Sequence, residues 1–211
     1  MNFFGHSVLA VRRSADPAFV LGSMLPDFAT MIRARAPGTE HADIESGMQF
    51  HWRTDEVFHR SPAFLALTRQ AVVWLSARGV RSGSALAVAH VGVEVMLDAA
   101  LSGDDRAQRA YRAALERAAG DELGRYVSWA SDDQRDRFDT LRGRLLARGA
   151  ITGDLAPETV AERLRSALAA RPRLSLDDTS VRAVRDWARV ARADISASAV
   201  PLVEHVAAQL L

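Results

Sequence analysis

Residues 86–101 read LAVAHVGVEVMLDAAL, and this stretch decides the fold. It predicts an apolar helix that carries three polar residues spaced four apart, His90, Glu94 and Asp98. Because a helix turns by about 100° per residue, all three side chains project from one stripe. Two carboxylates one turn apart among apolar side chains repel each other unless a cation or strong donors compensate them. The stretch therefore predicts either a helix that faces a metal ion or an arginine, or an amphipathic helix with a solvated polar edge.

Helical periodicity also runs through the rest of the chain, where polar and apolar residues show no convincing alternation. The sequence therefore predicts an all-α protein, a helical bundle, whose 211 residues form a single domain, 1–211. We expect a kink or a restart of the second helix at Pro26 and a turn over 36–40. The expected helical stretches are 3–13, a segment beginning at 17, 47–62, 62–79, 86–101, 104–119, 121–130, 132–148, 157–170, 177–193 and 196–210.

The composition excludes several classes of protein and of site. There is no cysteine, so any metal ion must be held by imidazole, carboxylate and water. All 27 basic residues are arginine, which GC-biased coding explains, and the net charge of +1 indicates no nucleic-acid surface. No apolar run approaches the ~20 uncharged residues of a membrane-spanning helix, and the first residues lack the charge order of a signal peptide. We therefore expect a cytoplasmic protein without a membrane span, and the sequence leaves its oligomeric state open.

The first 100 residues hold further histidines and acids at helical spacing. His6 lies on an apolar helix face, where it is either a satisfied core residue or a ligand. Asp27 is either a helix-terminal carboxylate or a ligand. His51, Asp55 and His59 repeat the spacing of four, which is either a favourable local pairing or the geometry in which neighbouring side chains reach one metal ion.

Together these side chains form a set of nitrogen and oxygen donors large enough for one or two divalent ions, and Mn, Fe or Zn fits such a mixture. The set comprises His6, Asp27, His51, Asp55, His59, His90, Glu94 and Asp98. Residues 104–211, by contrast, read as amphipathic helices of mixed charge with one histidine, His205. We therefore expect a metal-site half at 1–103 and a helical C-terminal half at 104–211.

Four short motifs in this first half resemble a known family. MNFFGH at 1–6, GSMLPDF at 22–28, HWRTD at 51–55 and EVMLD at 94–98 follow one another in that order. Their order and approximate spacing are similar to MNFLAH, GNLLADF, HRRID and DVMWDHFL in acyl carrier protein phosphodiesterases, all-helical metal-dependent hydrolases related to the HD phosphohydrolases. The resemblance covers roughly residues 1–101 and implies an HD-domain-like fold.

The resemblance implies a metal-dependent phosphodiester hydrolase that acts on phosphopantetheine linked to acyl carrier protein. In such an enzyme a divalent cation polarises a phosphoryl oxygen and activates water for in-line attack. The resemblance implies ligand roles for the four donors His6, Asp27, His51 and Asp55. Further residues would complete the site: Glu94 and Asp98 as ligands or base, His59 and His90 as ligands or proton carriers, and Arg53 as a phosphate contact. Asp55, Glu94 and Arg53 are thus the expected catalytic residues.

Two alternatives remain open at this point. Histidine followed four residues later by glutamate, as in His90 and Glu94, is similar to the ligand pairing of zinc-dependent phospholipases C, and GSMLPD resembles a segment of bacterial members of that group. The second alternative is a non-catalytic metal-binding helical protein, because Ala99 stands where the phosphodiesterase family often carries histidine. Both alternatives keep the metal ion and change the substrate or the turnover.

Overall fold

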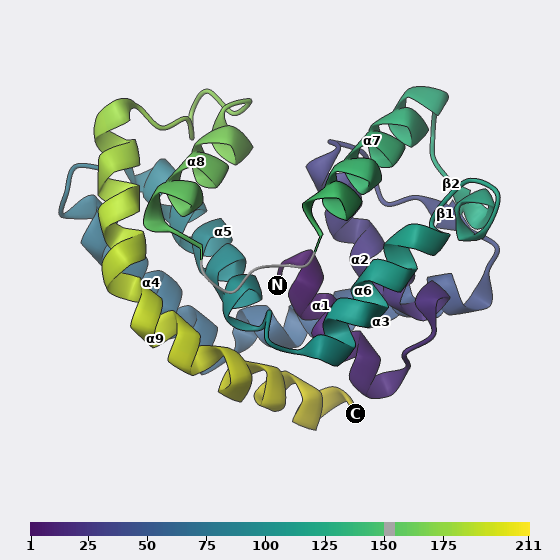
Figure 1. Ribbon diagram of the computed structural model, residues 1–211. Helices are drawn as coiled ribbons and strands as arrows, with labels where there is room; N and C mark the ends of the chain where they lie inside the picture. Colours follow the sequence, from purple (N-terminus) through teal and green to yellow (C-terminus); the bar gives the residue numbers. More distant parts are fainter. Residues whose placement is uncertain (150–154) are drawn as a thin grey trace. The chain divides into compact units, whose positions relative to one another are not determined.

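A computed structural model describes residues 1–149 and 155–211 and confirms the all-α class (Figure 1). Contacts between backbone positions divide the chain into two compact units. Of the described residues, unit 1 comprises 1–57, 102–149 and 207–211, and unit 2 comprises 58–101 and 155–206. Each unit therefore draws on both sides of the boundary at residue 103, and whether the chain acts as a single domain stays a prediction.

Unit 1 is built around three packed helices, α1 (Phe3–Arg13), α2 (Pro17–Met31) and α6 (Asp105–Arg117). Asp16 begins α2 because its carboxylate accepts hydrogen bonds from the backbone N–H groups of Ala18 and Phe19. Aromatic side chains fill the space between these helices: the rings of Phe4 and Tyr111 meet edge to face at 5.8 Å. The remaining elements of the unit are β1 (Gly38–Thr39), α3 (Ala42–Arg60) up to residue 57, η1 (Leu123–Tyr126), β2 (Val127–Ser128) and α7 (Asp132–Arg148).

Helices α2 and α3 cross at two glycines, Gly22 and Gly47. A Cβ atom added to Gly22 would collide with the carbonyl oxygen of Ile44, and one added to Gly47 would collide with the carbonyl oxygen of Phe19. The two backbones therefore approach more closely than any other residue type would permit. This crossing brings the middle of α3 against the carbonyl groups of α2.

Unit 2 is organised around α5 (Ser82–Ala100), which packs against α4 (Pro62–Ser76) and α8 (Pro157–Leu168). Ser61 caps α4 by accepting a hydrogen bond from the backbone N–H of Phe64, and Pro62 occupies the first turn. Gly92 makes room for the indole ring of the buried Trp187, a residue of α9 (Asp178–Leu210). The last residues of α3 also belong to this unit.

The expected helices 3–13 and 132–148 are confirmed at the same bounds, and the Ser61–Pro62 start of α4 is confirmed as well. The expected helix over 121–130 is wrong: the chain forms η1 and then β2, which pairs antiparallel with β1 inside the turn expected at 36–40. The carbonyl oxygens of Ala118 and Ala119 lie so close to Gly124 that no Cβ fits there. The chain therefore turns tightly at this point and does not continue as an α-helix.

Helices α2 and α9 each continue through a proline, Pro26 and Pro201. A kink or a restart was expected at Pro26; the restart is wrong, and the kink stays a prediction. The break expected between 177–193 and 196–210 is also wrong, because α9 is one helix. Buried side chains continue on both sides of each proline, for example Leu25 and Phe28, or Ala199 and Leu202. Burial of this continuous apolar stripe offsets the hydrogen bond that each proline removes.

In the described residues, α5 alone is long and apolar enough to cross a membrane by length and composition. The same criterion is met by core helices of proteins that span no membrane, and 56% of its most apolar window is buried inside the structure. The helix is therefore weak evidence for a span, and the described part of the chain contains no clear membrane-spanning segment.

Candidate metal centres

Seven of the nine predicted site residues fall into two groups, one inside each unit. His6 on α1, Asp27 on α2, and His51 and Asp55 on α3 lie in unit 1, where we call them the unit 1 cluster. In unit 2, His59 at the end of α3 meets His90 and Glu94 on α5, and we call these three residues the unit 2 cluster. Each cluster contains three donor atoms that all lie within 4.8 Å of one another, close enough to hold a metal ion.

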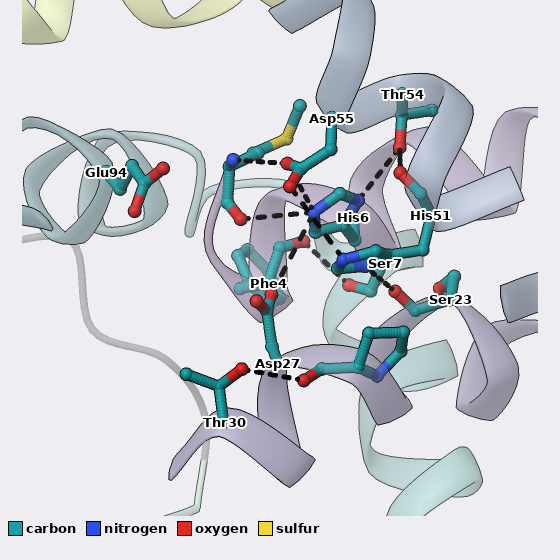
Figure 2. A network of polar contacts seen from close by, with 12 residues as sticks. Phe4, His6, Ser7, Ser23, Asp27, Thr30, His51, Thr54, Asp55 and Glu94 are labelled. Atoms are coloured by element: carbon teal, nitrogen blue, oxygen red, sulfur yellow. Dashed lines mark hydrogen bonds and ion pairs between the residues drawn. The ribbon is translucent and has the colours of Figure 1, made fainter. Parts of the chain in front are cut away.

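His6 is fully buried, and its hydrogen bonds fix which ring nitrogen faces the cluster (Figure 2). The Thr54 hydroxyl donates to the carbonyl oxygen of His51, so its oxygen accepts from His6 Nδ1 at 2.9 Å. The proton on Nδ1 is thereby fixed. His6 Nε2 faces oxygen acceptors: the Met1 carbonyl at 3.1 Å, Asp55 Oδ1 at 3.3 Å and Asp27 Oδ2 at 3.9 Å. These oxygen atoms would therefore stabilise a proton or another cation at His6 Nε2.

His51 has the same arrangement with a different scaffold atom. Its Nδ1 lies 2.9 Å from the carbonyl oxygen of Ser23, which can only accept, so Nδ1 carries the proton and Nε2 bears the lone pair. Burial and the neighbouring His6 lower the pKa of His51 to about 3, so the ring is neutral at pH 7. The two imidazole rings stack with their centroids 3.8 Å apart. The Gly22–Gly47 crossing makes the hydrogen bond from His51 to the Ser23 carbonyl possible, because Ser23 follows Gly22 directly.

Asp55 supplies the charge that both histidines face. Its carboxylate oxygens lie 3.3 Å from His6 Nε2 and 4.0 Å from His51 Nε2, and the Met1 ammonium contacts Oδ1 at 2.6 Å. Burial raises the pKa of Asp55, but hydrogen bonds and charge from His6 and from the Met1 ammonium outweigh it and hold that pKa below its usual range. Asp55 is therefore a carboxylate at neutral pH.

The unit 1 donor set fits a divalent metal ion. In a tetrahedral site with ligand bonds of about 2.1 Å, donor atoms lie about 3.4 Å apart. The separations that His6 Nε2 makes with Asp55 and Asp27, 3.3 and 3.9 Å, are close to that value. Both histidines also donate their second ring N–H to a scaffold acceptor, which is the usual arrangement of metal-ligating histidine. Two neutral imidazoles and two carboxylates would balance the charge of one divalent cation.

The unit 2 cluster is more exposed and is held differently. Glu94 Oε1 lies 2.9 Å from His59 Nε2 and 3.2 Å from His90 Nε2, and the two imidazole rings stack at 4.8 Å. Burial raises the pKa of Glu94, but the hydrogen bonds from His59 and His90 lower it more, and its pKa stays below the usual range. The His90 side chain is 50% exposed, whereas that of Glu94 is only 12% exposed.

The other predicted residues take no part in these groups of donor atoms. Asp98 is buried on α5 in unit 2 and belongs to neither group within the described residues. Arg53 is exposed on α3, two residues from both His51 and Asp55, and helix geometry turns it away from them. The ligand role of Asp98 and the phosphate-binding role of Arg53 therefore stay predictions.

The groups that support the candidate ligands were not predicted from the sequence. Thr54 is fully buried and orients His6, and the backbone of Ser23 orients His51. Thr54 carries a recognisable signal, because a hydroxyl three residues after a predicted histidine ligand lies on the same helix face. The glycine pair at 22 and 47 carries no such signal, because contact between two helices is set by the tertiary fold.

Comparisons with protein-family models, with curated proteins and with solved structures found no match to this chain.

Proposed function

We propose that this protein is a divalent-metal-dependent phosphodiester hydrolase whose metal ion is held by the unit 1 cluster. One observation carries the proposal: two buried histidines keep their Nδ1 atoms bonded to scaffold acceptors while both Nε2 atoms face the Asp55 carboxylate, and His6 Nε2 also faces Asp27. The cluster already attracts one cation, because the Met1 ammonium contacts Asp55 Oδ1 at 2.6 Å, and a divalent ion would supply positive charge to both carboxylates. The resemblance of 1–6, 22–28, 51–55 and 94–98 to acyl carrier protein phosphodiesterases supports the reaction class.

The side chains have separate tasks in this proposal. His6 and His51 are the neutral nitrogen ligands, and Asp27 and Asp55 are the anionic ligands. A divalent ion held there would supply Lewis-acid catalysis by polarising a phosphoryl oxygen and lowering the pKa of water. Thr54 and the Ser23 carbonyl keep the ligand tautomers fixed, so that the imidazoles need no reorganisation. Mn, Fe and Zn all suit this mixture of nitrogen and oxygen donors.

The proposal also names which diester substrates should be tested. The resemblance supports phosphopantetheine linked to acyl carrier protein as the first substrate to test, and a choline phosphodiester tests the phospholipase C alternative. Bis(4-nitrophenyl) phosphate serves as a generic diester that requires no particular recognition of the leaving group.

The experiment measures metal content and turnover on the same preparations. Full-length protein is purified, analysed for bound metals, stripped with a chelator, and reloaded with Mn²⁺, Fe²⁺ or Zn²⁺. Hydrolysis of the three diesters is then measured for wild type, for His51→Asn and for the control His41→Ala. Asn is the matched replacement, because its amide N–H₂ can still donate to the Ser23 carbonyl while it lacks the Nε2 ligand. His41 lies outside both clusters, against the ring of Tyr126.

We expect metal-dependent hydrolysis that is lost in His51→Asn and kept in His41→Ala. A protein that binds metal at the unit 1 cluster but hydrolyses none of the three diesters would instead be the non-catalytic metal-binding protein. A protein that takes up no metal, and whose unfolding ignores the chelator, would remove the basis of the proposal.

A further inference from the structure

We propose that the unit 2 cluster is a second metal site, with its own three ligands, for a divalent transition metal of the Zn²⁺ class. The ligands are His59, His90 and Glu94, all inside unit 2. This inference does not depend on the proposed function of the unit 1 cluster, because the two donor sets share no residue.

The geometry of the three donor atoms supports this site. Both imidazoles direct Nε2 at the same carboxylate oxygen, Glu94 Oε1, at 2.9 and 3.2 Å. These separations are slightly shorter than the ~3.4 Å edge of a tetrahedral zinc site. A small outward rotation of the two partly exposed histidines would therefore make room for an ion between the three atoms. Two histidines and one glutamate are also a recurrent ligand set of zinc sites.

The side chain of Phe64 packs against both imidazole rings, those of His59 and His90. Its ring meets that of His59 at 5.2 Å and that of His90 at 5.4 Å, both edge to face. Phe64 is itself buried, and its backbone N–H donates to the Ser61 hydroxyl at the start of α4. The turn between α3 and α4 thus fixes the ring on which both histidines rest. This support reduces the side-chain entropy that metal binding would otherwise cost.

Charge and exposure determine what kind of site this is. Glu94 brings one negative charge that is largely buried, whereas His59 and His90 are 30% and 50% exposed. Three protein ligands beside solvent leave at least one coordination position for water or for another donor. Structural zinc sites are instead closed by four protein ligands. The unit 2 cluster therefore fits an exchangeable metal that is reached from solution.

The test counts metal equivalents on the full chain. Metal-free wild type is titrated with Zn²⁺ by calorimetry at pH 7.5, and Co²⁺ is followed by its visible absorption as a second probe. The variants are Glu94→Gln, His90→Ala, the unit 1 variant His51→Asn and the control His41→Ala. Far-UV circular dichroism and the urea midpoint check that each variant is folded, and the half-exposed His90 is the substitution least able to disturb packing.

We expect two equivalents for wild type and for His41→Ala. Glu94→Gln and His90→Ala each lose one equivalent, or bind it at least about 100-fold more weakly, and keep the equivalent that His51→Asn removes. Wild-type stoichiometry and affinity in both Glu94→Gln and His90→Ala would overturn the site. A single wild-type equivalent that only His51→Asn removes would overturn it as well, while leaving the proposed function intact.

Discussion

The two clusters use the same residue types and differ in what holds the imidazoles. In the unit 1 cluster, Nδ1 of His6 is bonded to Thr54 and Nδ1 of His51 to the Ser23 carbonyl, and both Nε2 atoms face the Asp55 carboxylate. In the unit 2 cluster, Nε2 of each histidine contacts the glutamate, and the side chains are partly in solvent. The orientation of a histidine ligand thus depends on the hydrogen bond that its second ring nitrogen makes, as well as on its distance from a carboxylate.

The largest effect that we expect is a difference in stability between glycine substitutions at the helix contacts of the two units. Gly47→Ala must push backbone against backbone and is expected to lower the free energy of unfolding by about 3 kcal/mol. Gly92→Ala meets side chains and no backbone, the Trp187 ring and a methyl group of Leu164, and the gain in helix propensity of about 1 kcal/mol partly offsets that cost. Urea unfolding measures both, with Gly103→Ala as a control that meets nothing within 4 Å. Equal losses of unfolding free energy in Gly47→Ala and Gly103→Ala would contradict the close approach of α2 and α3.

The next largest effect is expected on diester hydrolysis, if the unit 1 cluster holds the catalytic metal ion. His51→Asn is expected to lower metal-dependent diester hydrolysis at least about 100-fold, because a ligand is lost while its scaffold hydrogen bond is kept. Steady-state kinetics at saturating metal measures the change. If a large excess of metal restores the wild-type rate, the histidine contributes affinity alone; if the rate is unchanged at every metal concentration, the cluster is not the metal site of the hydrolase.

A smaller effect isolates the support of His6. Thr54→Val removes the oxygen that accepts from His6 Nδ1, so the ring loses its fixed tautomer, and metal affinity should fall about 10–100-fold. Thr54→Ser keeps the hydroxyl and should bind metal as wild type does. Competition with a colorimetric chelator reports both affinities. Identical affinity in the valine and serine variants would show that the hydroxyl has no part in orienting His6.

The smallest effect is a difference in pH dependence in metal-free protein. The pKa of His51 is about 3 in the folded state and 6.5 in the unfolded state, so the unfolded chain binds more protons between these values. The free energy of unfolding should therefore fall as pH decreases through this window, by at most about 1.4 kcal/mol per pH unit from this residue. The lowered pKa of Glu94 contributes in the same direction only below its ordinary value of 4.5.

Urea unfolding at pH 7.5, 6.0 and 5.0 measures this slope. His51→Asn should have a shallower dependence than wild type over that range, whereas Glu94→Gln should follow wild type. Parallel curves for wild type and His51→Asn would mean that His51 is not held neutral by burial.

The sequence predicted the elements that local chemistry controls. Ser61 and Pro62 mark the start of α4 as a cap and a first-turn proline should, and spacing placed His51 beside Asp55 and His90 beside Glu94. It did not predict η1, where the chain turns so tightly that Gly124 lies against the carbonyl oxygens of Ala118 and Ala119. It also did not predict the supports of the imidazoles, because a backbone carbonyl such as that of Ser23 has no signature in the amino-acid pattern.

The two absent Cβ atoms at Gly22 and Gly47 provide a criterion for judging other sequences. A related chain that retained both imidazoles but carried a larger residue at either glycine would have to separate the two helices. The ring of His51 would then move away from the Ser23 carbonyl that orients it. Among relatives that keep both histidines, the two glycines should therefore indicate which chains still hold His51 against the Ser23 carbonyl.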